Sequence, residues 1–93
     1  MKTKPTITEL LDCQYIKDIK ALMEKYGIKG KTGDTSQCVI SNYLKAVTGL
    51  PKVRTTRYYC YDSDDAKIIL QATPALTDFI DAFDSSKFLE LVA

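Results

Sequence analysis

Apolar residues recur every three or four positions between residues 7 and 26, which is the period of an amphipathic helix. Thr6 precedes this stretch and Glu9 follows three positions later, the pattern of a capping box in which hydroxyl and carboxylate each reach a backbone amide. Residues 12–14 interrupt the stretch, and Asp12 is then the cap of a second helix. One helix and two shorter helices are both compatible with this pattern. The predicted stripe contains Leu11, Tyr15, Ile19, Leu22 and Tyr26, with Ile16 and Met23 beside it.

Residues 28–35 contain two glycines and show no apolar stripe, which predicts a loop. A further helix follows it, capped by a polar residue among residues 34–36, and the best-formed capping box joins Asp34 to Gln37. The glycine and proline of residues 49–51 end this helix. Its predicted apolar face consists of Val39, Ile40, Tyr43, Leu44 and Val47.

The hydrophobic period changes after Pro51. Residues 52–61 (KVRTTRYYCY) are rich in β-branched and aromatic side chains, which predicts a strand. Residues 62–65 form a polar turn and residues 67–71 a second strand, so the pair predicts a β-hairpin. Alternation along the first strand places Lys52, Arg54, Thr56, Tyr58 and Cys60 on one face and Val53, Thr55, Arg57, Tyr59 and Tyr61 on the other.

The last clear helix begins at Thr73 as N-cap with Pro74 in the first helical position. A short turn capped by Ser85 or Ser86 follows it and buries Phe88, Leu89 and Leu91. The inward face of the helix holds Ala75, Leu76, Phe79, Ile80 and Phe83, and its outward face holds Asp78, Asp81 and Asp84.

The order of these elements predicts the fold class. Two or three N-terminal helices, a β-hairpin and a C-terminal helix (α-α-β-β-α) make a small α+β protein, in which the helices cover one face of the hairpin. Residues 1–93 form a single domain in this interpretation. The chain has 93 residues, of which 45% are hydrophobic and nine are aromatic, and this composition excludes a disordered protein.

Composition also bears on location. No apolar run approaches the roughly 18 residues of a membrane span, and the first residues lack the apolar core of a secretory signal. Three cysteines are too few, and odd in number, for a disulfide framework, which fits a reducing compartment. We therefore expect a cytoplasmic protein with no membrane partner.

Charge is divided unequally along the chain, although the formal net charge is only +1. Residues 1–57 carry 11 basic and 5 acidic side chains, a balance of +6, whereas residues 58–93 carry 2 basic and 7 acidic ones, a balance of −5. The sign changes within the predicted hairpin. Opposite charges close together steer and orient protein encounters, so we expect a protein partner, with a homo-oligomer as an alternative.

The sequence holds few residues suited to catalysis. It contains no histidine, and Cys13, Cys38 and Cys60 match no zinc-binding or redox spacing. Gly30-Lys31-Thr32 lacks the upstream glycine of a phosphate-binding loop, and residues 62–65 lack the pattern of a calcium loop. We therefore expect no enzyme, no metal and no cofactor.

Basic and aromatic residues alternate in the first predicted strand. Arginine and tyrosine are enriched in protein-binding hot spots, while the same pair neutralises phosphates and stacks on bases in nucleic-acid binders. A solvated edge strand is the simpler alternative. Lys29 and Lys31, in the loop before a helix, are candidate anion-binding residues. The predicted interaction residues are Lys52, Arg54, Arg57, Tyr58, Tyr59 and Tyr61.

Several core, cap and turn residues within residues 36–91 carry a resemblance. They are Cys38, Tyr43-Leu44, Thr48-Gly49, Val53, Pro74, Phe79, Phe83-Asp84, Phe88 and Leu91. At these positions the chain resembles a class of small uncharacterised accessory proteins encoded by phages and bacteria. The resemblance implies a compact intracellular protein that binds a host or phage protein, including host-defence components. It carries over no catalytic residue.

These observations favour a non-enzymatic binding protein that acts through protein–protein interaction, and the resemblance specifies an inhibitor of a host defence or regulatory protein. A small nucleic-acid-binding protein is the first alternative. A nucleotide or second-messenger-binding protein is the second. Both alternatives would use the cations Lys29, Lys31, Lys45, Lys52, Arg54 and Arg57.

Overall fold

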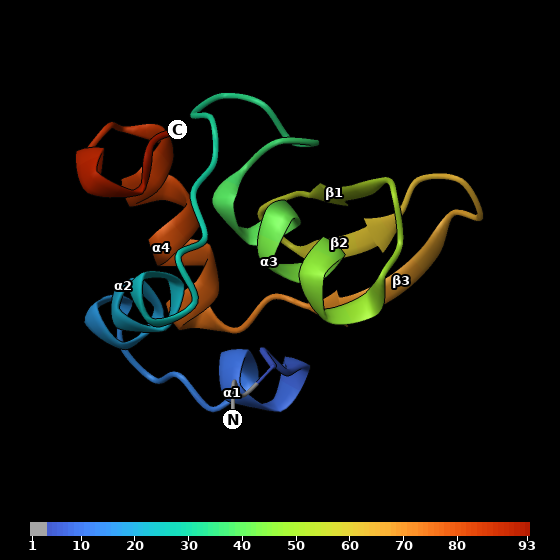
Figure 1. Ribbon diagram of the computed structural model, residues 1–93, viewed down its shortest axis with the longest axis horizontal. Coiled ribbons are helices and arrows are strands. Elements are labelled where there is room, and N and C mark those ends of the chain that lie inside the picture. The colour runs from blue at the N-terminus through green and yellow to red at the C-terminus, as the bar shows by residue number, and fades with distance from the viewer. Residues whose placement is uncertain (1–3) are drawn as a thin grey trace.

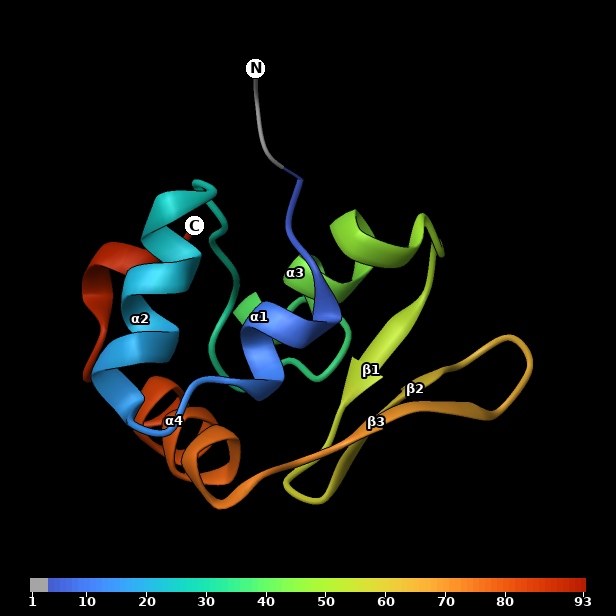
Figure 2. The same cartoon turned by 90° about the horizontal axis from the view of Figure 1, so that it is seen from below.

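The computed structural model describes residues 4–93 and has an α+β fold, as the sequence predicts (Figure 1). Three strands form one antiparallel sheet in the order β1-β2-β3. In Figures 1 and 2, α1 lies between α2 and the sheet, while α3 packs against β1 and α2 packs against α4. The elements are α1 (Ile7–Leu11), α2 (Ile16–Lys25), α3 (Val39–Thr48), β1 (Val53–Thr55), β2 (Tyr59–Asp62), β3 (Lys67–Gln71), α4 (Pro74–Asp84) and the 3-10 helix η1 (Leu89–Leu91).

The first helical region is two helices rather than one. Thr6 Oγ1 accepts from the amide of Glu9 at 3.1 Å, so the hydroxyl half of the predicted capping box is confirmed. The Glu9 carboxylate accepts from the hydroxyls of Thr6 and Tyr26 instead of a backbone amide. Asp12 ends α1 instead of capping α2, which begins after Tyr15. The interruption redirects the chain, so Leu10 enters the core while Tyr15 is 62% exposed. The prediction of one continuous apolar helical face that includes Leu11 and Tyr15 is therefore wrong.

The segment before α3 is a turn, and the predicted capping box belongs to it. Asp34 Oδ1 accepts from the amides of Ser36 at 2.9 Å and Gln37 at 3.2 Å. Cys38 then has an extended ψ of 149°, so α3 begins only at Val39. Asp34 therefore closes a turn, as aspartate side chains commonly do, and it does not cap the helix.

The predicted strand over residues 52–61 is wrong, because Thr56 turns the chain in its middle. Thr56 Oγ1 accepts from the amides of Tyr58 at 3.2 Å and Tyr59 at 3.1 Å, and the Thr56 amide donates to the carbonyl of Tyr59. The predicted two-stranded hairpin is therefore a three-stranded sheet. The turn also changes which residues of the predicted first strand face the core. The residues buried on its inner face are Val53, Thr55, Cys60 and Asp62.

The second predicted strand is confirmed as β3, with the same bounds. Cys60 pairs with Leu70 and Tyr61 with Ile68, so the register shifts by one residue between these two pairs. The shift leaves Ile69 as the extra residue of a β-bulge. Cys60 and Leu70 are buried, whereas Ile68 lies on the outer side of the sheet with Tyr61.

The C-terminal region follows its prediction more closely. Thr73 Oγ1 accepts from the amide of Leu76 at 3.2 Å, and Pro74 occupies the first position of α4. In η1, Leu91 is buried but Leu89 is exposed, which corrects the prediction for Leu89. No helix within residues 4–93 is long and apolar enough to span a membrane. The predicted inward residues of α4 are all buried: Ala75, Leu76, Phe79, Ile80 and Phe83.

Candidate functional site

One side of the sheet carries large side chains that the helices leave uncovered. We call it the outer sheet face. Arg54 and Tyr61 pair across β1 and β2, and Tyr59 pairs with Gln71 across β2 and β3. Ile68 is 57% exposed and Tyr59 38% exposed. The outer sheet face consists of Arg54, Tyr59, Tyr61, Ile68 and Gln71.

The turn between β1 and β2 explains why these residues meet. In a single strand, Arg54 and Tyr61 would lie on opposite faces. The turn at Thr56 brings them onto the same face, directly across from each other. The rings of Tyr59 and Tyr61 lie 5.6 Å apart with a 50° tilt, so they form one aromatic surface.

Tyr58 lies in the turn at the end of this face and is 73% exposed. Its backbone is held from both sides: its amide donates to Thr56 Oγ1 at 3.2 Å, and its carbonyl accepts from Ala72 N at 2.9 Å. An exposed tyrosine on a fixed backbone presents a large contact area at a low cost in conformational entropy.

Arg57, the remaining predicted interaction residue of this turn, contacts α4. Its Nη2 lies 3.0 Å from Asp81 Oδ2, and its carbonyl accepts from Thr77 Oγ1 at 2.8 Å. The structure therefore separates Arg57 from Arg54. It also shows where the two charge halves of the chain meet, since one basic residue of the turn pairs with the acidic face of α4.

A cleft of about 300 Å³ lies beside β1, between the start of the strand and α3. We call it the basic cleft. Lys45 enters it from α3, Lys52 precedes β1, and Arg54 belongs to β1. Ser36, Gln37, Pro51 and Ser63 complete its lining. Three cations that are separate in sequence therefore line one concave surface.

Buried hydroxyls hold the elements around this cleft in place. The carbonyl of Thr35 accepts from Ser41 Oγ at 2.6 Å and from the amide of Thr55 at 3.0 Å. Ser41 Oγ and Thr55 Oγ1 lie 2.7 Å apart, and both side chains are buried. The turn before α3, the helix itself and β1 are thus tied together. Sequence reasoning missed Ser41, which reads as an ordinary polar position in a helix.

The cations of the basic cleft have few anionic partners. Lys45 Nζ donates to the carbonyl of Ser36 at 2.7 Å and lies 3.4 Å from Asn42 Oδ1, both neutral oxygens. Lys52 Nζ lies 3.8 Å from Asp64. Within residues 4–93, this is the one ion pair that the three cations of the cleft make with a carboxylate.

The loop with Lys29 and Lys31 lies outside the basic cleft, although both lysines are exposed. Three of its backbone amides are occupied. Gly30 N donates to Leu91 O at 2.9 Å and Lys31 N to Gln37 O at 2.8 Å. Gly33 N donates to the carboxylate of Asp84 at 3.1 Å. These amides stabilise the fold and are not available to an anion.

The cysteines lie in surroundings that disfavour reaction. Burial raises the pKa of Cys38 to about 11 and that of Cys60 to about 11. Cys13 is half-buried, and burial raises its pKa as well. The thiolate is the nucleophilic form of cysteine, so these thiols react poorly near neutral pH. Within the described part of the chain, no group of three or more potential ligands is placed to hold a metal ion.

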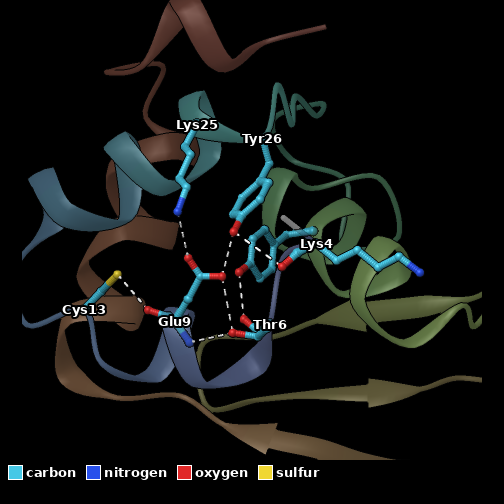
Figure 3. A network of polar contacts seen from close by, with 7 residues as sticks. Lys4, Thr6, Glu9, Cys13, Lys25 and Tyr26 are labelled. Carbon is cyan, nitrogen blue, oxygen red and sulfur yellow. Dashed lines mark hydrogen bonds and ion pairs between the residues drawn. The ribbon is translucent and has the colours of Figure 1, made fainter. Parts of the chain in front are cut away.

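A second polar cluster, the Glu9 network, joins α1 to α2 (Figure 3). Glu9 Oε1 accepts from the hydroxyl of Tyr26 at 2.7 Å, and Oε2 lies 3.3 Å from Lys25 Nζ. The hydrogen bond from Tyr26, followed by Lys25 and Thr6, holds the pKa of Glu9 below its ordinary value. Tyr43, from α3, donates to the carbonyl of Thr6 at 2.7 Å. The sequence predicted only the local contact between Thr6 and Glu9.

Comparisons of the chain with protein-family models, with curated proteins and with solved structures find no significant match. The candidate sites therefore depend on the geometry of this chain alone.

Proposed function

We propose that the chain is a non-enzymatic binding protein that docks a partner protein on its outer sheet face. The observation that carries this proposal is a surface of exposed Tyr58, Tyr59 and Ile68 with half-buried Tyr61, carried by a hydrogen-bonded sheet and its adjoining turn. Tyrosine and arginine are the residues that dominate binding energy at protein interfaces, and exposed apolar groups on a rigid element favour an interface over solvent.

Charge specifies the chemistry of the partner. Lys52 and Arg54 place positive charge along β1, at one border of the exposed tyrosines. A complementary surface would offer an apolar patch bordered by carboxylates, because matched charges orient the encounter and exclude wrong partners. The resemblance to phage and bacterial accessory proteins points to a host defence or regulatory protein, which this chain would inhibit by occupying its surface.

The experiment compares a double tyrosine variant at the outer sheet face with a single tyrosine variant elsewhere on the protein. Tyr58→Ala with Tyr59→Ala alters the outer sheet face and its adjoining turn, whereas Tyr15→Ala removes a tyrosine that is also exposed but lies before α2. The partner is isolated from host lysate with the full-length protein, purified, and titrated by calorimetry against each variant. A hot spot contributes about 2 kcal/mol, so the double variant should bind at least about thirtyfold more weakly.

Two controls must hold before the affinities are compared. Thermal unfolding must show that the double variant folds, and Tyr15→Ala must bind as tightly as the unaltered protein. If the double variant binds the purified partner with unchanged affinity, the outer sheet face is not the docking site. Mobility shifts of labelled oligonucleotides test the nucleic-acid alternative, since phosphate contacts weaken steeply as salt increases.

A further inference from the structure

We propose that the basic cleft binds the phosphate group of a small phosphorylated ligand. The cleft shares Arg54 with the outer sheet face, but the proposal does not depend on the docking function. The cleft brings together Lys45, Lys52 and Arg54 from a helix, a loop and a strand. Its volume of about 300 Å³ lies at the lower end of small-molecule sites.

The charge balance of the cleft favours an anion with more than one negative charge. Within residues 4–93, the three cations of the cleft make one ion pair, between Lys52 and Asp64. Both groups are exposed, and they lie 3.8 Å apart. Such a pair is screened by water and holds the lysine weakly. Asp34 and Asp62 are next to lining segments in the chain, and both carboxylates already accept hydrogen bonds, Asp34 from Ser36 and Gln37 and Asp62 from the amide of Asp64. The lining itself holds three cations and no carboxylate.

Hydrogen-bond donors in the cleft suit a phosphate. Lys45 Nζ uses two of its three protons on Ser36 and Asn42, which orients the ammonium group and leaves one donor. Arg54 makes a single long contact, 3.5 Å from Nη1 to Thr35 Oγ1, so most of its planar fork is available. A terminal phosphate offers three acceptor oxygens and nearly two negative charges at neutral pH. A single carboxylate offers two oxygens and one charge, which matches three cations less well.

The buried hydroxyl contact between Ser41 and Thr55 ties α3 to β1, the helix and the strand that carry Lys45 and Arg54. Ligand sites are usually formed before the ligand arrives, because ordering flexible groups costs binding free energy. Lys45 is already half-buried and oriented by its two oxygen partners. Lys52 and Arg54 are exposed, so their long stems can turn toward a bound phosphate.

The test is an NMR titration of the full-length ¹⁵N-labelled protein with inorganic phosphate, adenosine monophosphate and, as the carboxylate control, acetate. Low ionic strength keeps the charges unscreened. We expect saturable shifts of amides around Ser36, Gln37 and Ser63 with both phosphates, at a dissociation constant of about 1 mM or tighter. Tighter binding of adenosine monophosphate identifies a nucleotide ligand, whereas equal binding identifies a site that reads the phosphate group alone. Both results support the proposal.

Charge-matched variants decide whether the cleft is responsible. Lys52→Gln with Arg54→Gln should weaken phosphate binding by about tenfold or more, while Lys17→Gln with Lys87→Gln removes two exposed lysines elsewhere and should leave it unchanged. Tyr58→Ala with Tyr59→Ala should also bind phosphate normally, which separates this site from the docking surface. Linear shifts without saturation, equal shifts with acetate, or equal losses in both charge variants would overturn the proposal.

Discussion

The Glu9 network and the basic cleft are both clusters of charged side chains between helices and neighbouring segments, but they differ in how their charges are matched. Glu9 receives three donors from its own chain: Thr6, Lys25 and Tyr26. The cleft gathers three cations around one weak ion pair. Charged groups that have hydrogen-bond or ionic partners within the chain contribute to folding. Charges without such partners on a concave surface contribute little to stability and remain available for a ligand.

The largest expected effect lies where the Glu9 network meets the core, at Tyr43. This side chain is fully buried, and burial raises its pKa to about 12, so the hydroxyl remains a proton donor to Thr6. Tyr43→Ala should lower the free energy of unfolding by about 3–5 kcal/mol, as for other large aromatic residues. Tyr43→Phe keeps the ring and should cost only about 1 kcal/mol. Urea unfolding measures the free energy of unfolding of both variants. Equal losses in the two variants would contradict the assignment of the larger effect to the ring and the smaller one to the hydroxyl.

The second effect is a dependence of protein stability on pH through the Glu9 network. The folded state lowers the pKa of Glu9 through Tyr26 and then Lys25, so the folded protein holds the carboxylate charged to lower pH than the unfolded chain does. This contribution is present above the unfolded pKa and is lost as pH falls through the folded one. Glu9→Gln should therefore lose less stability on acidification than the unaltered protein.

Glu24→Gln is the matched control for that experiment, because Glu24 lies on α2 and makes only a 3.9 Å contact with Lys20. Thermal unfolding across the acidic range measures all three proteins. Glu24→Gln should follow the unaltered protein. Parallel curves for Glu9→Gln and the unaltered protein would show that the Glu9 network does not couple stability to pH.

The smallest effect is expected in the basic cleft. Lys52→Gln removes an exposed charge whose one ionic contact is long, so the free energy of unfolding should change by less than about 0.5 kcal/mol. The same substitution should weaken phosphate binding, which makes stability and binding separable at this residue. A loss of stability as large as that of Tyr43→Phe would place Lys52 among the groups that hold the fold.

Local sequence predicted those elements whose signals act within a few residues. The cap of Thr73 with Pro74, the apolar face of α4 and the bounds of β3 are all confirmed. The cap of Thr6 on Glu9 is confirmed for the same reason. A helix cap requires only a side chain and an amide three positions away, so no distant part of the chain needs to be known.

The candidate surfaces were predicted in part. The sequence singled out the Lys52–Tyr61 segment, but alternation put Arg54 and Tyr61 on opposite faces. The turn at Thr56 reversed that assignment, since it places the buried residues of β1 and β2 on one inner face and leaves Arg54 and Tyr61 on the other. The sequence did not indicate that Ile68 faces outward, because it begins an apolar run. Only the bulge at Ile69 places it on the outer side of the sheet.

The sequence by itself determined the α+β class, most element positions and the division of charge. Only the tertiary structure decided which cations converge and which glycine is indispensable to packing. A Cβ on Gly30 would lie 2.2 Å from the backbone nitrogen of Val39, although in sequence this residue reads as one more loop glycine. Lys45 and Lys52 likewise meet only because Ser41 and Thr55 join α3 to β1. Periodicity and caps are local, whereas close approach and charge convergence depend on contacts between residues far apart in the chain.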